Sequence, residues 1–282
     1  MGSLDIAAII PVFNDLPGLW RAVESVASQS VRPDELIIVD DGSTLHDNAT
    51  LSGLCEAFSA LAPRVIRLPC NGGPANARNV GWSAASSSLI AFLDSDEVWH
   101  PRKLEVQQRV MSGHSWLAGC GHRTEVLEVI DLKSSPQPHT EDPPLRRVTA
   151  RQQLVRNRFT TPSMMLRRSV PLRFAEGMRY SEDYDLWTRL LLEGHSLVVI
   201  EETLGYRDRA PFSGAGLSSN LWRMEQGELT VYRGLAKSGL ISSGVAYAYQ
   251  CWSLTRFLRR VAQRSRRQLM RSFAKSRTRP RI

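Results

Sequence analysis

The first hundred residues alternate short apolar runs with amphipathic segments, and this alternation restricts the fold more than any other feature of the chain. Four segments are predicted to be strands: 7–12, 36–39, 64–68 and 89–93, of which the first and the last are expected to be buried. Three intervening segments are predicted to be helices: 16–29, about 51–58 and 74–85. Strands joined by helices pair in parallel, so this order predicts an α/β fold with a mostly parallel central sheet and helices on both faces.

Polar and acidic residues follow three of the four predicted strands. They are, in chain order, Asn14 and Asp15, the segment 40–44 (Asp-Asp-Gly-Ser-Thr), and Asp94 with Asp96. The carboxyl ends of parallel strands meet at one edge of a sheet, and ligands bind beyond that edge. These side chains are therefore predicted to line one rim and to form the functional site.

Asp94 and Asp96 have the spacing of two carboxylates that share a hard cation. Mg²⁺ and similar ions prefer oxygen ligands, and they often take one or two protein carboxylates together with water and a diphosphate. The alternative is a solvated turn in which an aspartate caps the next helix. Segments 40–44 and 71–79 have the same alternative, a turn followed by a helix start. The shared position at the strand ends favours a site.

The sequence excludes several other classes of nucleotide-binding and metal-binding protein. It has no G-x-G-x-x-G after the first strand and no G-x-x-x-x-G-K-[ST], so the phosphate loops of dinucleotide oxidoreductases and P-loop enzymes are missing. Its four cysteines and six histidines are scattered without metal-ligand spacing, which disfavours a zinc site or a disulfide framework. A diphosphate is therefore predicted to be held through a metal ion.

The net charge of +8 belongs to the C-terminal tail. Residues 256–282 contain eleven Lys and Arg and no Asp or Glu, which leaves 25 basic and 28 acidic side chains elsewhere. A uniformly basic nucleic-acid-binding protein would not divide its charge in this way. Within 250–282, Leu254, Phe257 and Leu258 share a helical face with arginines over much of the remainder, as in a helix that lies on an anionic membrane. A core-packed helix with a charged outer face and a basic arm on nucleic acid are the alternatives.

The pattern changes after residue 101. The predicted elements there are a helix over 102–111, a hairpin over 116–131, a proline-rich mobile loop over 132–148, short and long helices over 149–156 and about 182–193, a strand over 197–200, and helix from about 217 onward. We therefore predict a domain over 1–207, with halves of about 1–100 and 101–207, and a helical C-terminal extension over 208–282.

Five motifs together resemble those of the family 2 inverting glycosyltransferases, which have a GT-A fold. They occur in the family's order over about residues 5–207: Ile10–Asn14, Ile38–Thr44, Gly72–Asn79, Phe92–Asp96 and Ser181–Trp187. The resemblance implies that the first half binds a nucleotide-sugar donor, here expected to be a UDP-sugar, and that the second half shapes the acceptor site. A saccharide or a lipid-linked saccharide is the expected acceptor.

The resemblance also implies roles for residues of the donor site. Pro11 and the adjoining backbone would line the nucleotide pocket, and Asp41 or Asp40 would contact the base. Arg78 would hold the uracil or the diphosphate, and Asp94 would contact the ribose or the sugar.

The remaining roles concern the metal ion and the reaction. The resemblance implies that Asp96 ligates Mn²⁺ or Mg²⁺ and that Asp183 is the general base. Asp183 also has a simpler interpretation, an acid that complements a helix N-terminus, and we prefer that interpretation for Glu182. Thr161 and Trp187 are candidate acceptor contacts, although Trp187 is equally suited to a buried core.

Two departures and two alternatives complete the prediction. The aspartate usual after Ser43-Thr44 is displaced to Asp47, and the Gln-x-x-Arg-Trp motif of processive synthases is absent, which favours single transfers. The alternatives are a non-catalytic nucleotide-sugar-binding protein of the same fold and a basic nucleic-acid-binding adaptor. No apolar run is long enough to span a bilayer and no signal-peptide pattern opens the chain, so we expect a cytoplasmic protein, peripheral at most to the membrane's inner face.

Overall fold

The computed structural model describes residues 4–45, 48–126, 138, 142–207 and 220–277. It divides into two compact units, Met1–Ala210 and Pro211–Ile282, while the boundary predicted from the sequence lies after residue 207. The first unit contains all the predicted site residues, and each unit is described by itself below.

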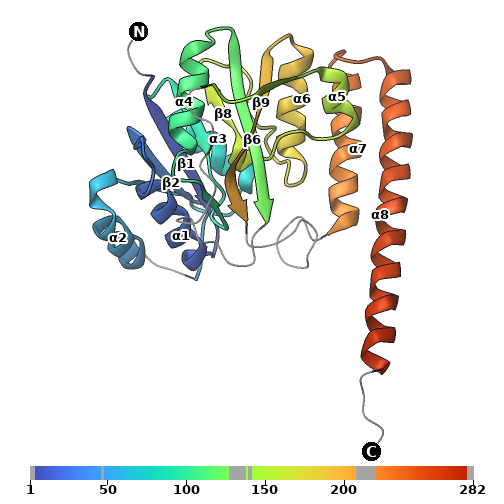
Figure 1. Cartoon of the computed structure of the whole chain (residues 1–282), viewed down its shortest axis with the longest axis horizontal. Coiled ribbons are helices and arrows are strands. Elements are labelled where there is room, and N and C mark those ends of the chain that lie inside the picture. The colour runs from blue at the N-terminus through green and yellow to red at the C-terminus, as the bar shows by residue number, and fades with distance from the viewer. Residues whose placement is uncertain (1–3, 46–47, 127–137, 139–141, 208–219, 278–282) are drawn as a thin grey trace, which may run out of the picture. The chain divides into compact units, whose positions relative to one another are not determined.

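The N-terminal half of the first unit alternates strands and helices as the sequence predicts. Its elements are β1 (Ile6–Val12), α1 (Leu16–Ala27), β2 (Glu35–Asp40), α2 (Asn48–Ala57), the 3₁₀ turn η1 (Ser59–Leu61), β3 (Arg64–Arg67), α3 (Pro74–Ala84) and β4 (Leu89–Phe92) (Figure 1). Asp15 caps α1 by accepting a hydrogen bond from the Gly18 backbone N–H, and Pro74 begins α3.

The second half of this unit mixes short strands with three helices. Its elements are β5 (Glu97–Trp99), α4 (Lys103–Gly113), β6 (Leu117–Val126), β7 (Leu145–Val148), α5 (Ala150–Val155), the 3₁₀ turn η2 (Thr161–Ser163), β8 (Met165–Arg167), α6 (Glu182–Leu192) and β9 (Ser196–Arg207).

All nine strands belong to one sheet with the order β3-β2-β1-β4-β8-β6-β9-β5, and β7 pairs with β9 outside this path. The prediction of parallel strands holds for the first four, which pair in parallel. The sheet becomes mixed beyond β4, because β8 runs antiparallel to both β4 and β6, whereas β6 and β9 are parallel. The register aligns Val12 with Asp40, and Asp40 with Arg67, so the first three strands end at one edge.

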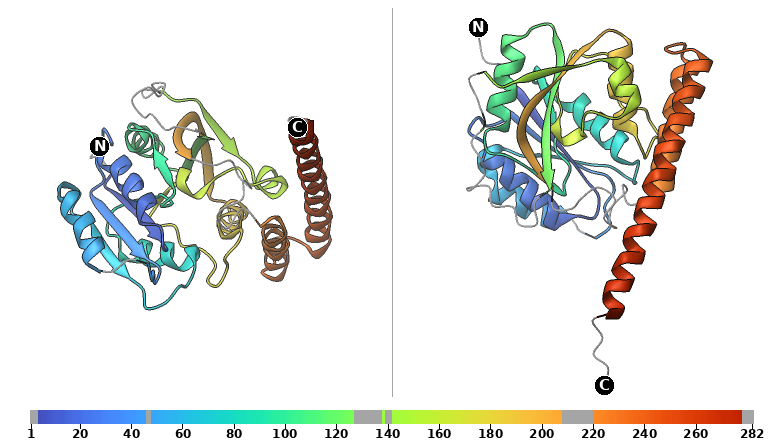
Figure 2. Two further views of the ribbon diagram at one scale, coloured as in Figure 1. Left: turned by 90° about the horizontal axis from the view of Figure 1, so that it is seen from below. Right: turned by 45° about the vertical axis from the view of Figure 1, so that its right-hand side comes forward.

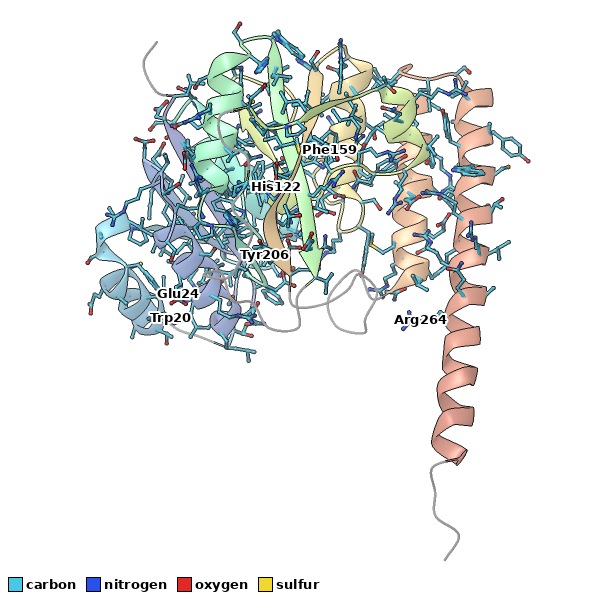
Figure 3. All side chains as sticks on the ribbon, viewed as in Figure 1. Trp20, Glu24, His122, Phe159, Tyr206 and Arg264 are labelled. Atoms are coloured by element: carbon cyan, nitrogen blue, oxygen red, sulfur yellow. The ribbon has the colours of Figure 1, made fainter. Side chains whose placement is uncertain are left out.

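Two helical layers cover the sheet, as the end-on view in Figure 2 shows. Alternate residues of β1 face opposite sides: Ala8 and Ile10 pack with apolar side chains of α1, α2 and α4, whereas Ala7 and Ile9 pack with those of α3 and α6. Figure 3 labels Trp20 on α1, whose ring lies 5.3 Å from that of Phe58. The strand-end rim is therefore supported by a packed core on both faces.

Three expectations for the segment between residues 97 and 148 were wrong. The segment 116–131 is no hairpin among its described residues, because β6 is one continuous strand that pairs with β8 and β9. Residues 145–148, predicted to be loop, form β7 against β9, although 132–137 and 139–141 lie outside the described residues. Segment 97–99 forms β5, an unpredicted strand. All three errors concern strands that pair with β9, which lies far away in the sequence.

The second unit is an antiparallel helical hairpin of α7 (Leu221–Lys237) and α8 (Ser243–Arg277). The rings of Tyr232 and Tyr249 stack with centroids 5.8 Å apart. Two basic side chains of α8 form ion pairs with α7: Arg256 with Glu228 and Arg260 with Glu225. Part of the positive charge of the tail is therefore neutralised by ion pairs within the hairpin.

Candidate active site

The loops that follow β1 and β2 are hydrogen-bonded to each other. The Asn14 side-chain oxygen accepts from the backbone N–H groups of Thr44 (2.8 Å) and Leu45 (3.0 Å). The Asn14 backbone N–H donates to the Ser43 hydroxyl over 2.9 Å. Asn14 has φ 54°, a left-handed conformation that asparagine tolerates better than most residues. The two loops thus form one rigid edge.

Asp40 at the end of β2 is fully buried and fixes the turn that follows it. Its Oδ1 accepts from the Ser43 backbone N–H at 3.0 Å, and its Oδ2 lies 3.2 Å from Nε of Arg67. Arg67 also donates to the Ser43 carbonyl at 2.9 Å. The structure therefore gives Asp40 a role in shaping the loop, and its contact with a base stays a prediction.

Asp41 connects β2 to the loop before α3. Its two carboxylate oxygens accept from the backbone N–H groups of Gly72 and Gly73, each over 2.8 Å. Burial raises the pKa of Asp41, and the two N–H donors counteract this shift. Gly42, at φ 70°, is required here, because a Cβ would lie 2.6 Å from the Cys70 carbonyl carbon. The hydrogen bonds of Asp41 therefore hold the loop that contains Gly72 and Gly73 against the end of β2.

Pro11 lies within β1 at a position where the sheet tolerates a missing N–H group. The pairing of β1 with β4 ends at Ile9, whose carbonyl accepts from Leu93, and Val12 accepts from Asp41 on the other side. Successive backbone groups of a strand alternate sides, so the nitrogen of Pro11 faces the side where β4 pairing has ended. Its ring therefore stands at the rim predicted to hold the nucleotide.

Arg78 bridges two carboxylates that are far apart in the sequence. One terminal nitrogen lies 2.6 Å from Asp94 Oδ1 at the end of β4, and the other lies 2.8 Å from Glu182 Oε1 at the start of α6. Arg78 is only 5% exposed, and its guanidinium lies 5.5 Å from the ring centre of Phe174. The two carboxylates hold its pKa above the usual value. Because both terminal nitrogens bind protein carboxylates, Arg78 connects Asp94 at the end of β4 to the helix that carries Asp183.

Asp96 is exposed at the rim, two residues beyond the partly exposed Asp94. The described residues contain no group of three or more His, Cys, Asp or Glu side chains able to hold a metal ion. An ion at Asp96 would thus have a single aspartate or a pair as protein ligands and would need further oxygens from water and a diphosphate. That donor set suits Mg²⁺ or Mn²⁺.

Behind Asp96, the segment Glu97–Trp99 is anchored deep in the fold. The Trp99 indole N–H donates to the Pro162 carbonyl over 3.0 Å, and the amine of the buried Lys103 lies 3.6 Å from the ring centre. Glu97 lies opposite Arg207 in the pairing of β5 with β9. Burial raises the pKa of Glu97 to about 8. The loop that carries Asp94 and Asp96 is therefore followed directly by a strand that is held in the core.

Asp183 lies in the first turn of α6, next to Glu182. Its Oδ1 accepts from the Tyr184 backbone N–H over 2.6 Å, and its Oδ2 accepts from the Asn157 side-chain amide over 2.9 Å. Burial, with a smaller contribution from the negative charge of Glu182, raises the pKa of Asp183 to about 7. A carboxylate with this pKa can accept a proton near neutral pH.

The two candidate acceptor contacts are both buried. Trp187 is 0% exposed and packs against Phe174, with ring centroids 5.8 Å apart, so the structure places it in the core. Thr161 is 5% exposed at the start of η2. The structure therefore links Asp94 through Arg78 to Glu182, the neighbour of Asp183, whereas Asp40 and Asp41 hold the adjoining loops and Trp187 lies in the core.

Two residues of this region were not found from the sequence. Phe13 follows β1 and is 48% exposed, so its ring is available at the rim; its place at a strand end is the signal that identifies it. Asn157 contacts Asp183 but belongs to no motif, and nothing in the sequence connects two residues 26 positions apart.

The family follows from comparison with known proteins. The model of "Glycosyl transferase family 2" matches residues 7–173, more than half of the chain, and the chain belongs to this family. A relative from Nostoc sp., named an uncharacterised glycosyltransferase, is 35% identical over 144 residues, which are 50% of this chain and 43% of that protein. The succinoglycan biosynthesis protein ExoO of Rhizobium meliloti is 29% identical over 219 residues, which are 72% of this chain and 60% of that protein. The chain spans less than half of the length of the first relatives.

Solved structures confirm the GT-A glycosyltransferase fold. TarS 1–349 of S. aureus, in complex with UDP-GlcNAc, has a TM-score of 0.66 at 18% identity, covering 89% of this chain and 72% of that one. The mannosyltransferase PcManGT of Pyrobaculum calidifontis, in complex with GDP-Man and Mn²⁺, has a TM-score of 0.64 at 13% identity, covering 98% and 81%. Among the described helices, none is long and apolar enough to cross a membrane.

Proposed function

We propose that this chain is an inverting glycosyltransferase that moves one sugar from a UDP-sugar to a hydroxyl of a saccharide or lipid-linked saccharide. The observation that carries the proposal is the chain of contacts from Asp94 through Arg78 to Glu182 and its neighbour Asp183. It joins the strand-end rim of the donor side to a carboxylate with the pKa of a general base.

The donor binds along the rim formed by β1, β2 and β4. In this proposal Pro11 and Asp41 line the nucleotide pocket, and the exposed ring of Phe13 stacks on the base. Asp94, held by Arg78, faces the ribose or the sugar. The direct contact of Arg78 with the uracil or diphosphate stays a prediction, because in the structure its terminal nitrogens bind Asp94 and Glu182.

Asp96 is the proposed protein ligand of Mn²⁺ or Mg²⁺. The fit rests on the exposure of Asp96 and on the carboxylate oxygens that it and the nearby Asp94 offer. When bound, such an ion supplies Lewis-acid stabilisation of the negative charge that develops on the leaving diphosphate.

Asp183 performs the acid–base part of the transfer. Its carboxylate accepts the proton of the acceptor hydroxyl while the hydroxyl oxygen forms a bond with the anomeric carbon of the donor sugar. The bond from that carbon to the diphosphate oxygen breaks at the same time, and the diphosphate leaves with the electron pair. Attack from the face opposite the leaving group inverts the anomeric centre. Asp183 thus both orients the hydroxyl and raises its nucleophilicity.

The biological setting is proposed from the relatives. ExoO and ExoW of Rhizobium meliloti are both named succinoglycan biosynthesis proteins, and ExoW is 39% identical over 102 residues. We place this chain in the synthesis of a polysaccharide or glycoconjugate. UDP is the nucleotide we propose, although structures of the same fold hold both UDP-GlcNAc and GDP-Man, so the nucleotide is part of the test.

Peripheral contact with an anionic membrane is proposed for residues 250–282. In the described part of this segment four apolar side chains of α8 are exposed: Trp252 (48%), Leu254 (37%), Leu258 (65%) and Val261 (37%). Apolar side chains on a helix rich in arginine favour binding at a lipid surface. A lipid-linked acceptor would be presented at the same surface.

The experiment compares Asp183→Asn with Asp185→Asn. Both carboxylates lie in the first turn of α6, but Asp185 is paired with Arg189 on its own helix. We expect Asp183→Asn to retain UDP binding and to lose sugar transfer by about 10²- to 10⁴-fold, whereas Asp185→Asn retains transfer. Full transfer by Asp183→Asn would contradict the base assignment. Nucleotide-sugar binding without transfer by the unaltered protein would support the non-catalytic alternative.

A further inference from the structure

Asn157 contacts the proposed base from a segment that contains none of the family motifs. It lies between α5 and η2, and its side-chain amide donates to Asp183 Oδ2 over 2.9 Å. The neighbouring Phe159, labelled in Figure 3, is 2% exposed and belongs to the core beneath α3 and α6. The core therefore fixes the chain that presents Asn157.

Two donors determine which way the Asn157 amide points. Its Oδ1 accepts from Nε2 of Gln153 over 2.9 Å and from the Phe159 backbone N–H over 3.3 Å. Because the oxygen is occupied by donors, the NH₂ group must face Asp183. An amide in the opposite orientation would place its oxygen against the carboxylate and leave two donors without an acceptor.

The orientation of the Gln153 side-chain amide is fixed in the same way. It is fully buried in α5, and its Oε1 accepts from the Arg158 backbone N–H over 3.0 Å. A directed series of hydrogen bonds therefore runs from the Arg158 backbone through Gln153 and Asn157 to Asp183. A reversed Gln153 amide would set its NH₂ group against the Arg158 N–H donor, so the series has a single arrangement.

The series has two consequences for Asp183. It fixes the carboxylate plane, because Oδ1 is held by the Tyr184 backbone N–H and Oδ2 by Asn157. It also favours the ionised form, since an N–H donor stabilises a carboxylate and not a carboxylic acid oxygen that carries a proton. Burial and Glu182 act in the opposite direction.

We propose that Asn157, oriented by Gln153, is a positioning residue that aims the Asp183 carboxylate and keeps it ionised for proton abstraction. This inference rests on the proposed function of Asp183 as the base. The rival explanation is that Asn157 only terminates α5 and packs the chain.

The test measures the titration of Asp183 directly and needs no substrate. Aspartate labelled with ¹³C at the carboxyl carbon is incorporated into the full chain, and the Asp183 signal is assigned by its loss in Asp183→Asn. The variants are Asn157→Ala, Asn157→Asp and Gln153→Ala. Gln152→Ala is the matched control, because Gln152 forms the capping box of α5 with Thr149 but has no part in the series.

We expect Asn157→Ala to raise the midpoint of Asp183 by about one pH unit, since a hydrogen bond to a charged group is lost. Asn157→Asp, which has nearly the same shape, should raise it further because a second carboxylate faces Asp183. Gln153→Ala should give a smaller rise, and Gln152→Ala none. Circular dichroism confirms that each variant is folded, and the Gln153 variant still tests the series if the Asn157 variants unfold.

Unchanged midpoints in Asn157→Ala, Asn157→Asp and Gln153→Ala would overturn the inference, as would an equal rise in Gln152→Ala. Failure here is distinguishable from failure of the proposed function. If Asp183→Asn abolishes sugar transfer while the Asn157 variants titrate normally, Asp183 is the base and only the positioning role is wrong.

Discussion

Arg78 shows how a single buried side chain can organise a site built from distant parts of the chain. A guanidinium that is 95% removed from solvent needs paired carboxylates, since an isolated buried charge is strongly unfavourable. Asp94 and Glu182 provide them, 16 and 104 positions away in the sequence. The position of α6, and with it that of Asp183, is thereby coupled to the end of β4.

The pKa of Asp183 predicts the pH dependence of transfer. Burial raises the pKa of this carboxyl to about 7, and a base must be deprotonated before it can accept a proton. We expect kcat to rise about tenfold per pH unit below the pKa and to level off above it. Initial rates between about pH 5 and 9 measure this, with metal held saturating. A rate that stays constant from about pH 5 to 7 would contradict the account.

Individual site residues were predictable to the extent that they lie at strand ends or in motifs. Asp40, Asp41, Asp94 and Asp96 follow predicted strands, and the structure places them at one edge. The partners of Arg78 were not predictable, because its pairing with Glu182 depends on how α6 packs against α3.

Among the helices and strands, α6 shows most directly how a sequence motif places a residue of the candidate site. It begins after Ser181, a residue with φ 60° that is 4% exposed. A left-handed conformation costs a non-glycine residue about 1–2 kcal/mol, so the surrounding packing must hold it in place. The apolar side of the helix, with Trp187 fully buried, provides that packing.

Replacement of Trp187 tests this role. We expect Trp187→Ala to lower the free energy of unfolding by about 3–5 kcal/mol, because a fully buried indole leaves a cavity. The matched control is Trp116→Ala, whose ring is 55% exposed and whose loss should cost less than about 1 kcal/mol. Urea unfolding followed by circular dichroism measures both. Equal effects would show that Trp187 is not part of the core and would revive its predicted contact with the acceptor.

The other informative element is α8, because its ion pairs with α7 decide which part of the basic tail can be removed to test the proposed membrane contact. Arg256 and Arg260 form ion pairs with α7, so a deletion from residue 256 would damage the hairpin. Deletion of 265–282 removes seven of the eleven basic residues of the tail and keeps those pairs. We expect the shortened protein to move from the pellet to the supernatant with phosphatidylserine vesicles.

Vesicles of neutral phosphatidylcholine provide the control, since each basic residue contributes about 1 kcal/mol only at an anionic surface. High salt should release the full chain in the same way. Equal sedimentation of the full and shortened proteins with anionic vesicles would refute the membrane proposal.

At the scale of the whole molecule, local pattern was sufficient for the first four strands and insufficient for the rest of the sheet. The strands β1, β2 and β4 carry apolar runs that are buried in the sheet, whereas β3 is a partly exposed edge strand with an arginine at each end. β5 and β7 contain only three and four residues and become strands by pairing with β9. Such pairing is non-local, so periodicity within 97–99 or 145–148 contains no signal for it.

The same contrast applies to the site as a whole. The gathering of Asp41, Asp94 and Asp96 at one edge could be predicted because parallel topology brings strand ends together. Asp183 was predicted only from the family motif. The hydrogen bonds that orient it come from a segment with no motif, so they could not be predicted.

The most direct test of the central claim is calorimetric titration of the protein with UDP in the presence of Mn²⁺. The measurement is repeated with EDTA, with GDP, with Asp96→Ala, and with Glu56→Ala, an exposed carboxylate on α2, as the matched control. We predict that UDP binds, that EDTA and Asp96→Ala each weaken binding by about tenfold or more, and that Glu56→Ala has no effect. Equal affinity for UDP with EDTA and in Asp96→Ala, or no binding of either nucleotide, would contradict a metal-assisted donor site at this rim.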